Sequence, residues 1–265
     1  MARLGDASLA RAAAKPTTSL ASHEMLLRGL ARFRGYGRDD NAAARDFFDQ
    51  ALARDPDYAL AHAYRALVDL AIAGYAEAPP SVIKAAVERA DLAVTLAPEE
   101  PRCHRVLSMM RLFAREHAAA EHHIRRSLEL NPYDADTMAQ LGYLLTMRGR
   151  PFEALAAMDD AARINPIHPD WYHYDRSVAL YSIAHYQEAI DCLSRLVVWA
   201  PWRLTRLAAC HAQLDNLARA RELMEEIRRT APGYAPMNFA RTGIAFEHPA
   251  DIDHFAEGVA KALAA

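Results

Sequence analysis

The stretch ADTMAQLGYLLTMRGRPFEALAAMDDAARINP, from Ala135 to Pro166, reads as two helices joined by a short turn. Gly149 interrupts the pattern near its middle. The closing proline lacks an amide hydrogen and biases the residue before it away from the α conformation, so it ends the second helix. Gly142 and Ala154 carry little side-chain bulk, which lets two antiparallel helices cross closely. The stretch therefore predicts a helical hairpin.

The same phrase recurs along the chain. Prolines close similar phrases at spacings of 42, 34, 34, 35 and 31 residues, and they are Pro56, Pro98, Pro132, Pro166, Pro201 and Pro232. Twelve positions before each proline the residue is alanine, namely Ala44, Ala86, Ala120, Ala154, Ala189 and Ala220. A period near 34 residues is the tetratricopeptide (TPR) length and is typical of stacked two-helix units. The sequence predicts an all-α, right-handed α-solenoid of about six TPR-like helix pairs, with no β-sheet.

The predicted helices alternate with short turns. We expect them at residues 24–35, 41–54, 58–74, 80–96, 101–115, 118–130, 135–148, 151–164, 169–184, 186–199, 201–214 and 217–230. Insertions enlarge the turns at RGYGRDDN and GYAEAPPS. The chain then divides into a linker or leader (1–20), the solenoid (21–232) and a C-terminal region (233–265). That last region is irregular at first and ends in an amphipathic helix, which we expect to cap the solenoid with Ile252, Phe255, Val259 and Leu263.

Composition excludes several classes of protein. The net charge of −3 and the pI near 6.5 give no general reason to bind nucleic acid or an anionic membrane. The first residues contain Asp6 and no continuous apolar region, which argues against a secretory signal. Cys103, Cys192 and Cys210 are odd in number and have no C-x-x-C spacing, which favours a reducing compartment, and we expect the cytoplasm.

No catalytic or cofactor motif is present in the sequence. It has no phosphate-binding loop, no H-E-x-x-H and no G-x-S-x-G, so we expect neither an enzyme nor a cofactor. His117, His122 and His123 cluster, but a separation of five residues turns two helical side chains apart. A metal-dependent enzyme built on the histidines is the remote alternative. Cys192 and Cys210 are most simply small core residues.

Four phrases carry a family resemblance: KPTTSLASHEMLLRGLARF, DPDYALAHAYRALVDL, NPIHPDWYHYDRSVALYSIAHYQEAI and FEHPADIDHFAEGVAKAL. Together they resemble the C-terminal tetratricopeptide (TPR) region of bacterial adenylate/guanylate cyclases and of related TolB-like or winged-helix regulators. In that family this region is sensory or regulatory. His62, Arg65 and Asp69 depart from the family pattern, and Arg65 and Asp69 could pair at i, i+4. The residues of cyclase chemistry have no counterpart here, so the resemblance implies a partner or lineage and not an activity.

The resemblance also implies a binding groove lined by the first helix of each pair. By the family alignment, its groove-facing positions are Arg105, Met109, Tyr143, Thr146, Trp171, Tyr174, Tyr181 and Trp202. The aromatic residues could anchor a peptide, or they could simply belong to the core between repeats. The Lys/Asn set of a carboxylate clamp does not occur at these positions.

We therefore expect a non-catalytic scaffold that binds a protein or peptide, with the detached regulatory half of a class III cyclase or transcriptional regulator as the alternative. The sequence leaves self-association open. The arginines of the third repeat are most simply a solvated face, with a patch for an acidic partner as the alternative; they are Arg102, Arg105, Arg111, Arg115, Arg125 and Arg126.

Overall fold

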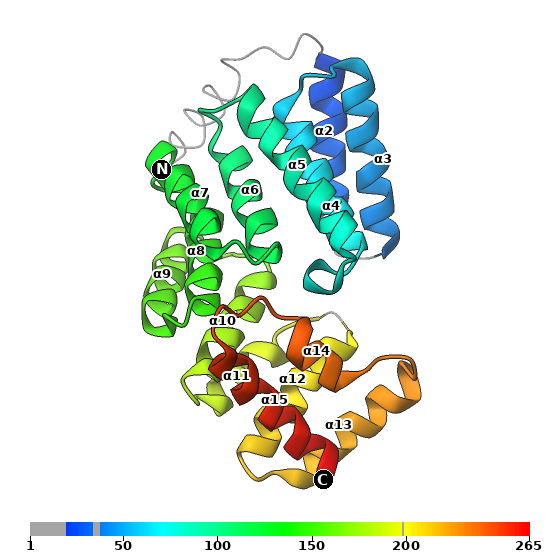
Figure 1. The fold of residues 1–265 in the computed structure, drawn as a ribbon, viewed down its shortest axis with the longest axis vertical. Coiled ribbons are helices and arrows are strands. Elements are labelled where there is room, and N and C mark those ends of the chain that lie inside the picture. Colours follow the sequence, from blue (N-terminus) through cyan, green and yellow to red (C-terminus); the bar gives the residue numbers. More distant parts are fainter. Residues whose placement is uncertain (1–19, 34–37, 198) are drawn as a thin grey trace.

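A computed structural model describes residues 20–33, 38–197 and 199–265. Within these ranges the chain is all-helical, with no strand (Figure 1). Six antiparallel pairs follow one another, and in each pair we call the first helix A and the second B. The pairs are α2 (Leu20–Phe33) with α3 (Arg38–Arg54), α4 (Ala59–Ile72) with α5 (Pro80–Leu96), α6 (Pro101–Phe113) with α7 (His117–Leu130), α8 (Ala135–Met147) with α9 (Pro151–Ile164), α10 (Trp171–Ser182) with α11 (Tyr186–Ser194), and α12 (Pro201–Gln213) with α13 (Leu217–Thr230).

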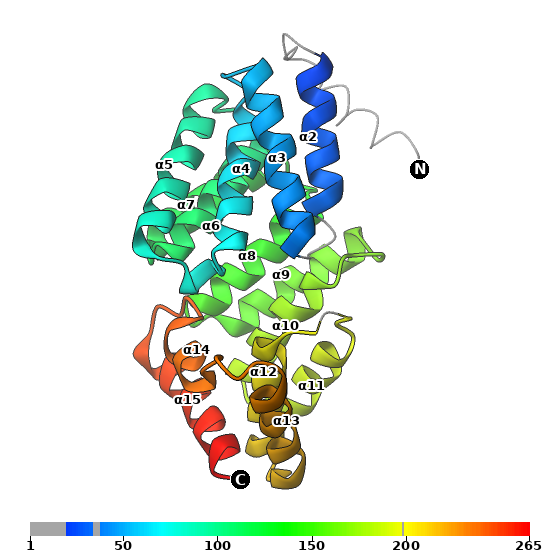
Figure 2. The same cartoon turned by 90° about the vertical axis from the view of Figure 1, so that its right-hand side faces the viewer.

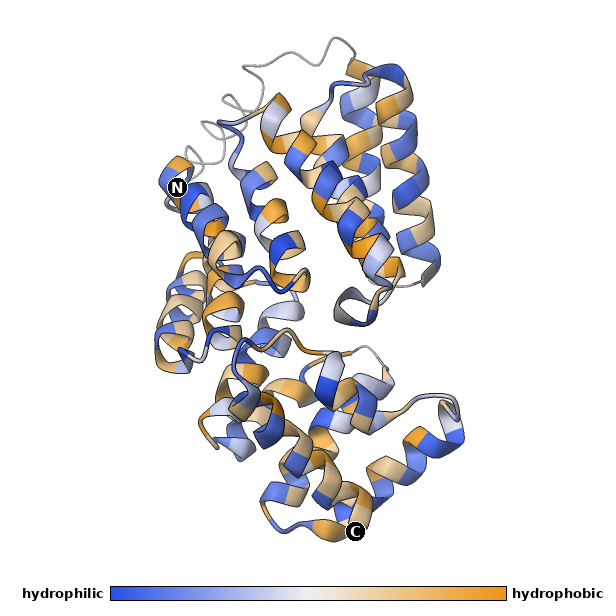
Figure 3. Ribbon diagram, viewed as in Figure 1, coloured by the Kyte–Doolittle hydropathy of each residue, from blue (hydrophilic) through white to orange (hydrophobic). Residues whose placement is uncertain are grey.

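The periodic alanines lie where the sequence predicts them, in the contact between A and B helices. Ala44, Ala120, Ala154, Ala189 and Ala220 are each 0% exposed. A side chain is excluded at Gly142 as well, because a Cβ there would lie 2.8 Å from the carbonyl oxygen of Ala154. The equivalent A-helix positions of the other pairs also hold small residues, namely Gly29, Ala66, Ser108, Ser177 and Ala208. Hydrophobic and hydrophilic residues alternate along the helices, as expected when each helix buries one stripe (Figure 3).

The structure contradicts the predicted bounds of two helices. The first was expected to begin at residue 24, but α2 begins at Leu20. We expected a helix over 186–199, but α11 ends at Ser194. The backbone leaves the helix there, which lets Leu196 be buried while Val197 is 88% exposed. Ala200, which precedes Pro201, is fully extended at φ −157° and ψ 141°. The insertion at residues 74–81 contains a short 3-10 helix, η1 (Tyr75–Glu77). The predicted linker up to residue 19 and part of the first enlarged turn lie outside the described residues.

The turns between A and B helices share one backbone feature. Arg115, Gly149, Ala184 and Asp215 occupy equivalent positions in successive pairs, and their φ angles are 63°, 71°, 60° and 57°. This left-handed conformation costs a residue with a side chain about 1–2 kcal/mol. Three of the four turns therefore carry strain that glycine would avoid.

Two further helices complete the fold, α14 (Pro236–Thr242) and α15 (Pro249–Ala264). In Figure 2, α14 and α15 lie on one side of α10 and α12, and the B helix α11 lies on the other. α15 packs mainly along α12 and also touches α13 and α10. Phe255 and Val259 are buried, whereas Leu263 is 45% exposed. The C-terminal helix thus covers inner A-helix surface as well as the last B helix.

Candidate binding groove

The eight groove positions of the sequence analysis fall into two classes in the structure. Tyr143, Thr146 and Tyr181 are 7%, 1% and 3% exposed, so these side chains are buried. The remaining five are half-buried and retain surface, namely Arg105, Met109, Trp171, Tyr174 and Trp202. Their role in binding stays a prediction. The difference in exposure shows which of them a partner could reach without rearrangement.

Tyr181 is buried because the C-terminal helix lies on it. Its ring is 5.3 Å from the ring of Phe255 and 5.1 Å from that of His254, both in α15. A side chain at Gly258 would strike it, since a Cβ there would fall 2.0 Å from the Tyr181 hydroxyl oxygen. This contact raises the pKa of Tyr181 by desolvation. Tyr181 is therefore a packing residue between α10 and α15.

Arg206 of α12 holds the same junction together. It is 2% exposed, and its guanidinium carbon lies 5.2 Å from the ring centroid of Tyr174. The same atom is 5.8 Å from Phe239 of α14 and 4.9 Å from Phe255 of α15. A desolvated guanidinium among aromatic faces gains cation–π stabilisation. The residue thus joins the groove wall to both C-terminal helices.

A buried carboxyl group lies beneath this junction. Asp175 of α10 is 8% exposed. Burial raises its pKa well above the ordinary value, and the charge of Arg206 offsets only part of that effect. No ion pair joins the two among the described residues, and Arg206 forms none with any other carboxylate there. The surroundings of Arg206 are therefore mainly aromatic and apolar.

Four of the five half-buried positions lie towards the beginnings of the A helices, whereas Met109 lies further along α6. We call the surface formed by these four residues and Asp136 the open strip: Arg105, Asp136, Trp171, Tyr174 and Trp202. A polar network crosses part of it. Arg105 donates to the Tyr64 hydroxyl at 3.2 Å and pairs with Asp136 at 3.9 Å. The Tyr172 hydroxyl donates to Asp136 at 2.9 Å. Four successive A helices, α4 to α10, are therefore linked by side-chain contacts.

Tyr64, Asp136 and Tyr172 are not among the positions predicted from the sequence. A signal existed, because Asp136 and Tyr172 each stand one residue away from the first residue of their A helices. The open strip also contains an aromatic pair, because the Tyr174 and Trp202 rings pack edge to face with their centroids 4.9 Å apart. The strip offers a peptide both hydrogen-bonding groups and rigid aromatic surface.

The third repeat does not present a free basic patch. Arg102 pairs with Glu100 at 2.8 Å, Arg111 with Asp91 at 2.5 Å, and Arg126 with Glu99 at 3.1 Å. Arg125 pairs with Glu121, which also pairs with Arg148 and Arg150. Neighbouring carboxylates thus neutralise most of these arginines. Arg115 differs, because its guanidinium contacts backbone carbonyl groups.

The histidines and cysteines have structural surroundings. The Nδ1 atoms of His104 and His123 are 3.2 Å apart. Desolvation, then the neighbouring His104, lowers the pKa of His123 to about 4, so the ring stays neutral near pH 7. No group of three potential metal ligands occurs within the described part of the chain. Burial raises the pKa of the Cys210 thiol to about 12, which disfavours a reactive thiolate there.

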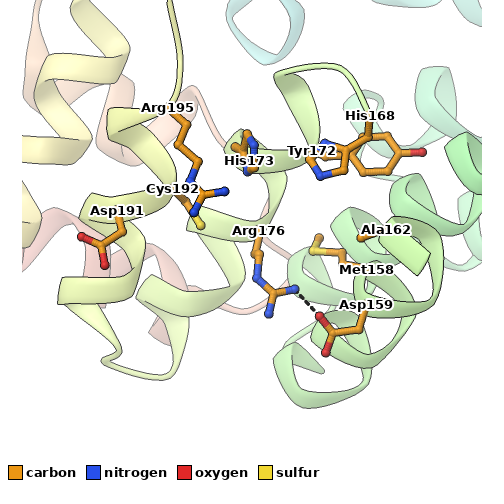
Figure 4. Close-up of a pocket in the computed structure, with 10 residues that line it drawn as sticks. All are labelled: Met158, Asp159, Ala162, His168, Tyr172, His173, Arg176, Asp191, Cys192 and Arg195. Carbon is orange, nitrogen blue, oxygen red and sulfur yellow. Dashed lines mark hydrogen bonds and ion pairs between the residues drawn. The ribbon is translucent and has the colours of Figure 1, made fainter. Parts of the chain in front are cut away.

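A second concavity of about 260 Å³ lies on the outer side, between α9, α10 and α11 (Figure 4). Arg176 pairs there with Asp159 at 2.6 Å, and Arg195 and His173 face the same space. Burial, followed by the charges of His168 and Arg195, lowers the pKa of His173. Two carboxylates, those of Asp159 and Asp191, line the concavity together with the two guanidinium groups of Arg176 and Arg195. The concavity is therefore mixed in charge and is not organised around one kind of ligand.

Comparison with solved structures identifies the architecture. A PilF structure from Pseudomonas aeruginosa is 18% identical, covers 82% of this chain and 94% of its own, and has a TM-score of 0.54. TTC0263 from Thermus thermophilus, described as a TPR protein, is 18% identical over 73% of this chain and 99% of its own, with a TM-score of 0.56. The Cut9–Hcn1 assembly of the APC/C has a TM-score of 0.61 at 16% identity, over 80% of this chain and 44% of that one. The fold is a TPR solenoid.

No protein-family model matches the chain, and a search of curated proteins found no match either. The TPR solenoid assignment therefore comes from structure and from the repeat pattern. Within the described residues, no helix of this solenoid combines the length and apolar character needed to cross a bilayer.

Proposed function

We propose that this TPR solenoid is a non-catalytic scaffold that binds an extended or helical peptide of a protein partner along its open strip. The observation that supports this most is the pairing of half-buried Trp202 and Tyr174 in one aromatic surface, next to a polar network that spans four A helices. Rigid aromatic side chains give large contact area at low entropic cost, and they are enriched among binding hot spots. TPR solenoids bind partners without needing chemistry of their own.

The open strip also suggests what the partner presents. Apolar or aromatic side chains would pack against Trp202 and Tyr174. Peptide backbone groups would meet Asp136, whose side chain is 42% exposed, and the Arg105 guanidinium beside it. The free thiols of Cys103, Cys192 and Cys210 fit a reducing compartment, and we place the scaffold in the cytoplasm.

Peptide display on the purified chain would test this function. A peptide selected from a random library should bind Trp202→Ala about 5- to 150-fold more weakly than the wild type, the range that corresponds to 1–3 kcal/mol for a hot-spot truncation. Trp199→Ala is the matched control, since Trp199 is 48% exposed and donates to Glu226 outside the groove. Fluorescence anisotropy gives both affinities. Equal affinities for the two variants would place the peptide elsewhere.

The second candidate is a regulatory half that acts on a separate cyclase or transcriptional regulator. The four phrases quoted above support it, because they resemble the regulatory region of those proteins. Mixing the purified chain with a cyclase encoded beside it should change that enzyme's rate. Cyclase activity from the chain alone would contradict both candidates. Light scattering would show whether the scaffold self-associates.

A further inference from the structure

The connection between α14 and α15 binds to the rest of the molecule as a peptide ligand would. We call residues Thr242–His248, with the sequence TGIAFEH, the docked segment. Beyond Thr242 it has no regular secondary structure, and it runs past the turns that follow α6 and α8 (Figure 1). Ile244, Ala245 and Phe246 are 1%, 0% and 5% exposed. The docked segment is therefore buried against the turns between A and B helices.

The turn after α6 recognises the backbone of the docked segment. Arg115 donates to the carbonyl oxygens of Ile244 at 2.8 Å, Thr242 at 3.0 Å and Phe246 at 3.3 Å. The Nε2 atom of the buried His117 lies 2.7 Å from the Ala245 carbonyl oxygen, close enough for the ring to donate. The side chains of Arg115 and His117 thus contact four backbone carbonyl groups of the docked segment. These contacts do not depend on which side chains the docked segment carries.

The turn after α8 binds the other end. The Glu247 amide donates to the carbonyl oxygen of Met147 at 2.7 Å. The Arg148 guanidinium donates to the Glu247 carboxylate at 2.9 Å. His248 lies over Gly149, where an added Cβ would be 2.7 Å from the imidazole. This end therefore selects an acidic residue and leaves room for a planar ring.

Arg115 adopts a strained conformation in this role. Its φ of 63° is left-handed, whereas the equivalent turn after α8 uses Gly149. Ala184 and Asp215 share this conformation at the equivalent turns, so what distinguishes Arg115 is the set of contacts that its side chain makes. Among the described residues Arg115 has no carboxylate partner, and the carbonyl groups of the docked segment are what its side chain contacts.

We propose that the turns after α6 and α8 form a second peptide site, separate from the open strip, which the docked segment occupies as an internal ligand. Its external ligand is an extended peptide of the same pattern, apolar–Ala–aromatic–acidic. Backbone carbonyl groups supply most of the polar contacts, so another chain can supply them equally well. The inference rests on the proposed function in taking a peptide as the partner. Tethering at both ends gives the docked segment a high effective concentration, and this keeps the site closed in the free protein.

Two full-length variants and one labelled peptide test the proposal. Ile244→Ser with Phe246→Ser weakens the docked segment and leaves the receptor turns intact, and the second variant adds Arg115→Ala. The probe is a fluorescein-labelled peptide, ARTGIAFEHPA, which copies residues 240–250. The double variant should bind it at least about tenfold more tightly than the wild type, and Arg115→Ala should remove about tenfold or more of that gain. A scrambled peptide is the control.

Failure of the double variant to bind the probe better than the wild type would overturn the proposal, and so would indifference to Arg115→Ala. Should the double variant not fold, hydrogen exchange in the wild type decides. The Glu247 amide should exchange at least about 100-fold faster than the interior amides of α12, because the docked segment opens locally. If the Glu247 amide exchanges only as slowly as the α12 amides, the docked segment does not open locally, and the proposal is overturned. Trp202→Ala should leave probe binding unchanged, which separates this site from the open strip.

Discussion

The two ends of the A helices differ in how much groove surface they expose, although residues seven apart lie on the same face of a helix. In α10, Tyr174 is half-buried and faces Trp202, whereas Tyr181, seven residues later, is 3% exposed beneath α15. The open strip keeps its surface because no part of the described chain covers it. The covered end is filled by α14, α15 and the docked segment. In a solenoid, exposure at a groove position is thus decided by what lies outside the repeats as well as by the repeats.

The largest effect should come from removing an aromatic anchor of the covered end. Phe255→Ala should lower the free energy of unfolding by about 3–5 kcal/mol, since a buried Phe is lost and a cavity remains between α15 and Arg206. Urea unfolding measures the change. Leu263→Ala, on the same helix but 45% exposed, is the control and should change stability far less. Similar losses of stability in both variants would mean that the buried and the exposed side of α15 contribute equally, which would contradict the prediction.

Arg115→Gly should be the next largest. Glycine relieves the left-handed backbone, yet the variant loses three hydrogen bonds to the docked segment. Because hydrogen bonds from a charged donor outweigh the relief, we expect a net loss of about 1–3 kcal/mol by urea unfolding. A gain in stability would show that the docked segment contributes little.

The buried carboxyl group of the covered end predicts a pH dependence. The folded pKa of Asp175 is raised, so the folded state holds the proton where the unfolded state, with a pKa of about 3.9, has released it. Its contribution to stability is fully present below the unfolded pKa and is lost as pH rises through the folded pKa. Asp175→Asn should remove this fall, whose slope is at most about 1.4 kcal/mol per pH unit. Urea unfolding from pH 4 to pH 8 compares the two profiles, and parallel profiles would contradict the assignment.

The smallest effect should come from Ala184, in the turn after α10. Ala184 has φ 60° and is exposed, and its side chain makes none of the contacts that Arg115 makes. Ala184→Gly should raise stability by a few tenths to about 1 kcal/mol, because the left-handed penalty exceeds the added entropy of the unfolded chain. Thermal unfolding would detect the rise. A fall in stability would show that strain at these turns is negligible.

The repeats could be predicted from the sequence because their signals are local. A proline ends each B helix, and an alanine twelve residues earlier marks each crossing, so pairs such as α8 and α9 were predicted within a residue or two. The early end of α11 was missed, since burial of Leu196 overrides the helical pattern of residues 186–199. Small residues such as Ser108 and Ser177 were a readable signal that went unused.

The covered end could not be predicted, because it depends on contacts between residues far apart in the chain. Arg115 and Ile244 are separated by 129 positions, and no periodic pattern links them. The same holds for Tyr181 and Phe255, which meet only because α15 returns along α12. The groove-facing positions implied by the family resemblance therefore stay a prediction, and sequence patterning could not indicate which of them the C-terminal region covers.

Hydroxyl-radical footprinting of the wild-type chain, with and without a library-selected peptide, tests the contrast between the two ends most directly. Trp202 and Trp171 should be oxidised in the free protein and protected when the peptide binds, while Phe255 and Tyr181 should stay unreactive in both states. Strong oxidation of Tyr181 in the free protein, or binding without protection at Trp202, would contradict the account.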